Sequence, residues 1–107
     1  MSAKPFAIRH KFKAVATAVD GIRFDSKREA AYYLKLKLQV AAGEVVTFLR
    51  QVPFHLPGGV RYVCDFQVFL ASGEVLFVDT KGVQTESFKA KKRMFEQLYQ
   101  PIKITLA

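Results

Sequence analysis

The sequence has very little cysteine and no long apolar run. Its 107 residues include one cysteine, Cys64, and no tryptophan. A single cysteine excludes an internal disulfide and a cysteine-based zinc site. No segment approaches the roughly 20 apolar residues of a membrane-spanning helix, and the first residues lack the continuous apolar stretch of a secretory signal peptide. We therefore expect a protein of the reducing cytoplasm with no membrane partner.

Acidic residues are also scarce. Nine Asp and Glu stand against 17 Lys and Arg, which gives a formal net charge of +8. On a small domain this excess favours a polyanionic partner, most often nucleic acid, with simple solubility as the alternative. The length suits one domain. We predict a basic N-terminal arm over residues 1–18, with Lys11 and Lys13 and no acid, and a single domain over 19–107.

A second basic group lies on one short segment near the end of the chain. It consists of Lys89, Lys91, Lys92 and Arg93. In a nucleic-acid-binding protein these side chains would contact the phosphate backbone, which positions DNA without reading its sequence. Lys11 and Lys13 of the N-terminal arm could do likewise. The alternative is an ordinary solvated helix face.

Apolar periodicity and turn residues predict an α/β fold around one mixed sheet. Ser26 is a good N-cap and Gly43 a good C-terminal stop, so a helix is expected from 26 to 43. Its predicted apolar face consists of Ala30, Tyr33, Leu34, Leu38 and Ala41. The other expected elements are strands at 45–50, 52–56, 61–70 and 74–80, a helix at 86–99 and a strand at 102–106. Pro53 indicates an edge or irregular position for the strand that contains it.

The two longest strands are joined by the three residues 71–73, which predicts an antiparallel hairpin. In that register Leu70 pairs with Glu74, and Asp65 faces Asp79 on the same side of the sheet. Like charges that face each other directly are destabilising. A shared proton, a salt bridge to Lys81 or a bound divalent cation would offset their repulsion.

The divalent cation has the clearest chemical rationale. Mg²⁺ prefers oxygen ligands, usually one or two carboxylates with waters and a substrate phosphate, and it polarises the phosphoryl oxygen and activates a bound water. A lysine beside it orients that water or stabilises charge on the phosphate. We therefore hypothesise a metal-dependent phosphodiester-hydrolysis site of Asp65, Asp79 and Lys81. A partly exposed strand face with a local Asp–Lys pair is the simpler alternative.

Glu29 is a further candidate, with two open roles. Ser26 and Glu29 fit a capping box, in which the glutamate returns to the N-cap amide. Glu29 also lies four residues before Tyr33, on the expected inner side of the helix. It could therefore reach the aspartates as a metal or water ligand.

Three segments together resemble a known superfamily. They are "FDSKREAAYY" (24–33), "YVCDF" (62–66) and "VDTKG" (78–82), followed by a lysine-rich helix. A first-helix glutamate, a hairpin aspartate and an Asp-x-Lys triplet resemble the PD-(D/E)XK nuclease superfamily. More narrowly, residues 20 to 105 look like a small family encoded by bacteriophages and prophages, related to phage junction-resolving endonucleases. Cys64 stands where the name-giving proline would be, and Asp79 replaces the more usual glutamate.

This resemblance implies a restriction-endonuclease-like core, in which a central mixed sheet with an antiparallel hairpin is flanked by helices. It also implies that Glu29, Asp65 and Asp79 ligate Mg²⁺, with Mn²⁺ as a substitute, and that Lys81 is catalytic. Gln51 is an accessory candidate or, more simply, a solvated strand residue. The expected function is a metal-dependent endodeoxyribonuclease acting on double-stranded or branched DNA in phage recombination or DNA processing, in the cytoplasm of a bacterial host.

A homodimer follows naturally from that function, because a symmetric cut of two strands calls for two active sites. Two other classes of function stay open. The domain could be a non-catalytic nucleic-acid-binding module on a nuclease-like scaffold, or a small phage factor that binds a host protein through its basic surface.

Overall fold

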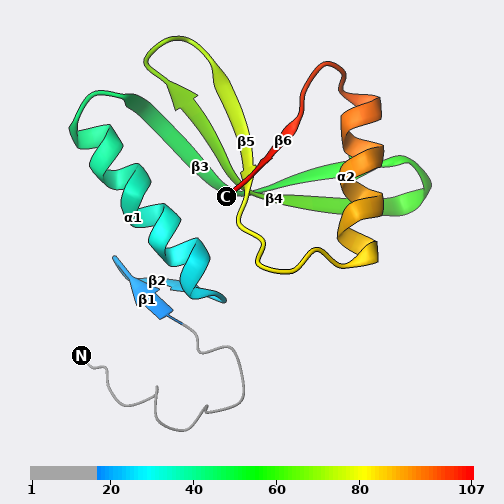
Figure 1. The fold of residues 1–107 in the computed structure, drawn as a ribbon, viewed down its shortest axis with the longest axis horizontal. Coiled ribbons are helices and arrows are strands. Elements are labelled where there is room, and N and C mark those ends of the chain that lie inside the picture. The colour runs from blue at the N-terminus through cyan, green and yellow to red at the C-terminus, as the bar shows by residue number, and fades with distance from the viewer. Residues whose placement is uncertain (1–16) are drawn as a thin grey trace, which may run out of the picture.

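The computed structural model describes residues 17–107 as an α/β fold (Figure 1). Its elements are β1 (Thr17–Val19), β2 (Ile22–Phe24), α1 (Lys27–Ala41), β3 (Val45–Leu56), a short 3-10 turn (Pro57–Gly59), β4 (Val60–Leu70), β5 (Val75–Asp79), α2 (Glu86–Leu98) and β6 (Ile104–Leu106). One sheet has the strand order β3-β4-β5-β6, and β1 pairs with β2 in a separate hairpin. Within residues 17–107, no helix is long and apolar enough to cross a membrane.

The four-stranded sheet is mixed, as the sequence predicts. Neighbouring strands are antiparallel from β3 to β5, and β5 is parallel to β6. The predicted fold, a mixed sheet with an antiparallel hairpin and flanking helices, is thus confirmed. The expected arm over 1–18 lies almost wholly outside the described residues, and β1 begins inside it at Thr17.

The predicted register of the β4–β5 hairpin is confirmed. Phe66 pairs with Val78 and Phe69 with Val75, and the amide of Leu70 donates to the carbonyl of Glu74 at 2.9 Å. The three-residue turn therefore fixes which residues face each other along both strands.

Strand β3 differs from the expectation of two separate strands. It is continuous over twelve residues and pairs with β4 in one register on both sides of Gln51, although Gln51 has a φ of 51°. A residue in this left-handed region bends the strand locally without shifting its partners. β3 is an edge strand, which explains how it accommodates Pro53.

Helix α1 begins as predicted, but its buried face was predicted wrongly in part. The side chain of Ser26 caps the helix, and Ala30 and Tyr33 are buried. Leu36 is also buried, whereas Leu38 is 72% exposed and Leu34 and Ala41 are exposed as well. The buried residues Ala30, Tyr33 and Leu36 are spaced three apart, and such a row runs obliquely to the helix axis. The helix face that contacts the sheet therefore does not include Leu34 and Leu38.

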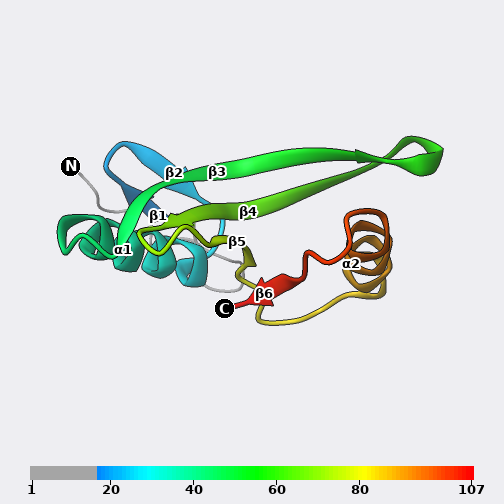
Figure 2. The same ribbon diagram turned by 90° about the horizontal axis from the view of Figure 1, so that it is seen from above.

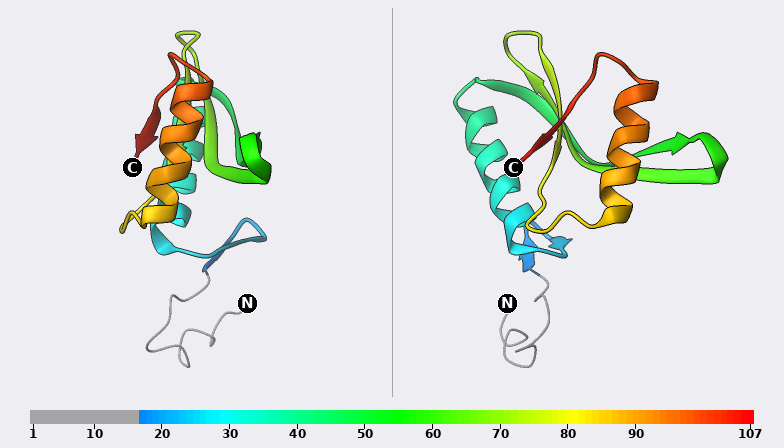
Figure 3. Two further views of the ribbon diagram at one scale, coloured as in Figure 1. Left: turned by 90° about the vertical axis from the view of Figure 1, so that its right-hand side faces the viewer. Right: turned by 45° about the vertical axis from the view of Figure 1, so that its right-hand side comes forward.

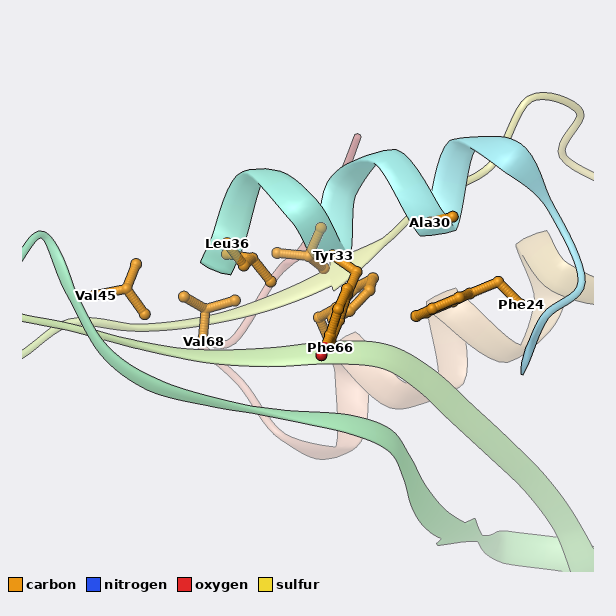
Figure 4. Packing of buried hydrophobic residues seen from close by; sticks show 8 residues of the cluster. Phe24, Ala30, Tyr33, Leu36, Val45, Phe66 and Val68 are labelled. Carbon is orange, nitrogen blue, oxygen red and sulfur yellow. The ribbon is translucent and has the colours of Figure 1, made fainter. Parts of the chain in front are cut away.

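Two apolar clusters hold the domain together. The α1 cluster is made of Phe24, Ala30, Tyr33, Leu36, Val45, Phe66, Val68 and Val78 (Figure 4). The α2 cluster is made of Leu56, Tyr62, Cys64, Phe77, Phe88, Phe95 and Ile104. Figure 2 shows the β3–β4 hairpin extending over both helices, and Figure 3 shows α1 and α2 on either side of β5 and β6. Cys64 is fully buried, as expected for a small apolar side chain.

Strand β4 passes from one cluster to the other between Cys64 and Phe66, which belong to the α2 and α1 clusters respectively. On β5, the neighbours Phe77 and Val78 also divide between the two clusters. Asp65 lies at this crossover point. The fold therefore places it where the two halves of the domain meet.

Candidate functional site

Asp65 and Asp79 lie next to each other at the end of the β4–β5 ladder. Asp79 is the last residue of β5, and its side chain is 0% exposed. One of its oxygens, Oδ1, accepts from the backbone amide of Asp65 at 2.9 Å. In return, Oδ2 of Asp65 accepts from the amide and the hydroxyl of Thr80, both at 2.9 Å. Each carboxylate is thus held by a group from the other arm of the hairpin.

Glu29 joins this pair from the first turn of α1. Its amide donates to the Ser26 hydroxyl at 3.0 Å, which is one half of a capping box. Its carboxylate, however, points to β3: Oε2 accepts from the Gln51 side chain at 2.8 Å and from Arg50 at 3.4 Å. Because Glu29 is buried at 8% exposure, the helix presents this carboxylate to the sheet rather than to solvent.

Gln51 is the bridge between the two acids. Its amide nitrogen donates to Glu29 and also to Oδ1 of Asp65, at 3.3 Å. Gln51 occupies the position on β3 that faces Asp65, since Arg50 pairs with Phe66 and Val52 with Cys64. Gln51 is an exposed strand residue whose side chain contacts both acids, and its accessory role stays a prediction.

Burial and like charge act together on these acids. Burial raises the pKa of Glu29, and the negative charge of Asp65 raises it further against the pull of Arg50 and Gln51. Burial also raises the pKa of Asp79, although hydrogen bonds from Tyr62 and from the Asp65 amide oppose the shift. The fully ionised cluster is therefore electrostatically unfavourable in itself, and a bound cation would relieve it.

Three residues that contact the acid cluster were not identified from the sequence. Tyr62 donates its hydroxyl to Oδ2 of Asp79, and burial together with this bond raises the pKa of Tyr62, so the hydroxyl stays a donor. Arg50 pairs with Glu29 and lies over the Phe24 ring at 4.5 Å. Thr80 holds Asp65. Tyr62 and Arg50 could have been found only from knowing which faces of β3 and β4 meet α1 and β5.

Lys81 departs from the expected geometry. β5 ends at Asp79, so the alternation of side chains does not continue to Lys81. Its ammonium lies over the Phe88 ring, 5.0 Å from the centroid, and the ion pairs within residues 17–107 do not include it. A salt bridge from Lys81 to the aspartates, one of the three options considered, is therefore absent there. Its charge still lowers the pKa of Asp79 through space.

The residue types in the cluster suit a hard cation, but their arrangement is not that of a preformed metal site. Carboxylate and amide oxygens are the ligands that Mg²⁺ prefers, and Glu29, Asp65, Asp79 and Gln51 supply them. Within residues 17–107, however, no three acidic, cysteine or histidine side chains converge as a preformed metal site. Of these four residues, Glu29 and Asp79 are buried, Asp65 is partly exposed and Gln51 is exposed.

Comparison with known proteins places the chain in a family. A family model described as "Protein of unknown function (DUF1064)" matches residues 9–107, nearly the whole chain. The chain belongs to the DUF1064 family. No curated protein and no solved structure matches it significantly. The description of the family names no activity, so the resemblance to PD-(D/E)XK nucleases stays a prediction.

The basic residues predicted to bind nucleic acid are divided in this DUF1064 protein. Lys89 pairs with Glu86 at 3.4 Å and Lys92 with Glu96 at 3.1 Å. Arg93 is exposed, and Lys91 lines a surface pocket together with Lys81. Lys11 and Lys13 lie outside the described residues. Of the four basic residues of α2, two are thus paired with glutamates, one is exposed and one lines the pocket.

Proposed function

We propose that this protein is a metal-dependent endonuclease that hydrolyses phosphodiester bonds in DNA. The observation that carries the proposal is the linked set Glu29–Gln51–Asp65–Asp79, drawn from α1, β3, β4 and β5. Two of its carboxyl groups have raised pKa values. Such perturbed acids are typical of functional sites, and the clustered oxygens suit a divalent cation.

Each residue has a definite role in this proposal. Asp65 and Asp79, assisted by Glu29, would hold Mg²⁺ or Mn²⁺. The bound cation would polarise the phosphoryl oxygen and activate a water. Gln51 keeps Glu29 and Asp65 at a fixed separation, and the Tyr62 hydroxyl keeps Asp79 oriented. Lys81 adds positive charge near Asp79 and would stabilise negative charge on the substrate phosphates around the cut.

DNA is the proposed substrate because of the net charge of +8. An excess of basic residues on a small domain favours binding to the phosphate backbone. We further propose a homodimer, which supplies two sites for a cut in both strands, and a branched or double-stranded substrate in phage recombination or DNA processing.

Labelled linear, nicked, flapped and four-way DNA, with RNA versions of the same strands, would test the activity in Mg²⁺, in Mn²⁺ and in a chelator. The proposal predicts cutting of at least one DNA substrate with either cation and none in the chelator. Cleavage that persists in the chelator would exclude a metal-dependent mechanism. Tight binding of every substrate without cleavage in any divalent cation would exclude the enzyme.

One observation favours a second candidate, a non-catalytic nucleic-acid-binding module. Within residues 17–107 no preformed group of three metal ligands exists, and Asp79 is fully buried. In this alternative Asp79 has a structural role, fastening β4 to the end of β5. The same experiment separates the two candidates, because the binding module retains DNA without cutting it.

A further inference from the structure

A surface pocket of about 290 Å³ lies beside the acid cluster, at the start of α2. Three basic residues line it: Arg61 from β4, Lys81 from the segment after β5, and Lys91 from α2. Thr85 and Ser87 add polar residues, Tyr62 is part of the wall, and no acidic residue is among the lining residues. The pocket is therefore a concentration of positive charge from three separate parts of the chain.

Positive charges gathered in this way repel one another unless an anion joins them. Neither Arg61, Lys81 nor Lys91 is in an ion pair within residues 17–107. The situation differs for Lys89 and Lys92 on the same helix, which each have a glutamate partner. The chain thus leaves unpaired the cations that face the pocket and neutralises two that do not.

The start of α2 adds to the same electrostatic field. Thr85 is the N-cap, and its hydroxyl accepts from the amide of Phe88 at 3.1 Å. The amides of the first helical turn point out of the helix end, where its dipole carries a partial positive charge. Lys81 lies over the Phe88 ring at 5.0 Å, so the aromatic ring holds this ammonium at the pocket.

The pocket and the acid cluster share a wall. Tyr62 lines the pocket and also donates its hydroxyl to Asp79. Lys81 lines the pocket and acts electrostatically on Asp79. A ligand held there would therefore sit directly beside the proposed hydrolytic centre.

We propose that this pocket binds one phosphate group of the nucleic-acid strand, next to the phosphate that is cut. The inference rests on the proposed function for its biological meaning, while binding of phosphate itself does not require that function. Arg61 supplies a planar donor fork that suits phosphate oxygens, and the two lysines supply point charges. The pocket would fix the register of the strand relative to Asp65 and Asp79.

Amide chemical-shift titration of the ¹⁵N-labelled protein tests the pocket directly, at low ionic strength and without metal. The probes are inorganic phosphate, the 5′-phosphorylated thymidine dinucleotide pTpT, and TpT. We expect shifts confined to residues 61–63 and 81–91. A response to both dinucleotides supports the inference, because the only phosphate of TpT is an internal phosphodiester. A response to pTpT alone would overturn it, because the pocket would then require a terminal phosphate.

Matched variants give the decisive comparison. Lys91→Ala and Arg61→Ala should each weaken phosphate binding about tenfold or more, because each removes a charged hydrogen-bond donor. Lys103→Ala is the control, since it loses the same charge from an exposed position away from the pocket. No shift near the pocket with any probe would overturn the inference. Equal weakening by all three variants would do so too, because it would show binding to net charge alone.

Failure of this inference and failure of the proposed function are distinguishable. Phosphate binding by a protein that cuts no DNA keeps the pocket and rejects the nuclease. Metal-dependent cleavage by a protein that shows no phosphate binding in the pocket rejects the pocket and keeps the nuclease.

Discussion

The two sides of Asp79 have opposite chemistry. Toward α1 lie Glu29 and Asp65, two carboxylates joined by one glutamine side chain. Toward α2 lie Arg61 and Lys91, in a pocket without an acid among its lining residues. Strand β4 contributes to both environments, since Arg61 and Asp65 both belong to it.

Under the proposed function, this difference would give the two sides separate roles toward one substrate. A cation at the acidic side would act on the phosphate that is cut, and the basic side would hold a neighbouring phosphate. Tyr62 belongs to both sides, since it bonds to Asp79 and lines the pocket. In the proposed function the two regions would therefore act on one bound strand.

The apolar core is likewise divided into an α1 part and an α2 part. The α1 cluster lies under the acidic side and the α2 cluster under the basic side, with β4 and β5 common to both. Phe66 and Phe95 are each fully buried in their own cluster. If β4 and β5 couple the two sides, a change on one side should affect the stability of the other.

The largest effect is expected from truncating either cluster. Phe95→Ala and Phe66→Ala should each lower the free energy of unfolding by about 3–5 kcal/mol, the usual loss for a buried phenylalanine. Because both clusters share β4 and β5, urea unfolding followed by circular dichroism should stay a single transition with a lower midpoint. A biphasic curve in either variant would show that the two sides are independent units.

The next effect is stabilisation by metal, which is specific to the acidic side. The raised pKa values of Glu29 and Asp79 mean that the folded chain binds protons more tightly than the unfolded chain. Their contribution to stability is therefore full below the ordinary acid pKa of about 4 and is lost as pH rises through the raised values. Mg²⁺ should restore stability at neutral pH, by about 2.7 kcal/mol at a hundredfold excess over its Kd.

Glu29→Gln is the matched variant for that measurement. It removes one of the repelling charges and keeps a similar shape, so thermal unfolding without metal should depend less on pH than in the wild type between acid and neutral pH. Stabilisation by Mg²⁺ should also shrink in this variant. Identical pH and Mg²⁺ responses in both proteins would remove Glu29 from the site.

Tyr62→Phe tests the residue that joins the two sides. Loss of its hydroxyl leaves a buried oxygen of Asp79 without a donor, which should cost about 1–3 kcal/mol. That hydrogen bond lowers the pKa of Asp79, so its removal should move the acidic limb of the cleavage pH profile to higher pH. Tyr33→Phe is the control, because it loses a bond to Asp20 instead. A shift of the profile in the control as well would disprove a local effect.

The smallest effect concerns the backbone of Gln51. Its φ of 51° is unfavourable for a residue with a side chain and acceptable for glycine. Gln51→Gly should therefore be more stable than Gln51→Ala by about 1 kcal/mol in thermal or urea unfolding. Both variants lose the bridge to Glu29 and Asp65, and we expect about tenfold slower cleavage in each. Wild-type cleavage in both would limit Gln51 to a structural role.

The sequence predicted the features that local rules determine. A three-residue turn sets the hairpin register, so Asp65 and Asp79 could be paired without a structure. Ser26 marked the start of α1 for a similarly local reason.

Features that depend on tertiary contact were not predictable. The angle at which α1 crosses the strands determines which of its residues contact the sheet. As a result Leu36 is buried and Leu38 is exposed. The direction of Lys81 depends on β5 ending at Asp79 and on the Phe88 ring beside it. Arg50 and Tyr62 join the site only because β3 and β4 bring them to acids from other elements.

The central claim is that the acid cluster is a hydrolytic centre, and Asp79→Asn tests it most directly. Asparagine keeps the size of the side chain and an oxygen for the Asp65 amide, and it removes the charge that a cation needs. Single-turnover cleavage of four-way DNA in Mg²⁺ should fall about a thousandfold or more, since the metal supplies several kcal/mol. DNA binding should stay equal or become tighter, because a negative charge is lost. Cleavage by Asp79→Asn at the wild-type rate would contradict the account.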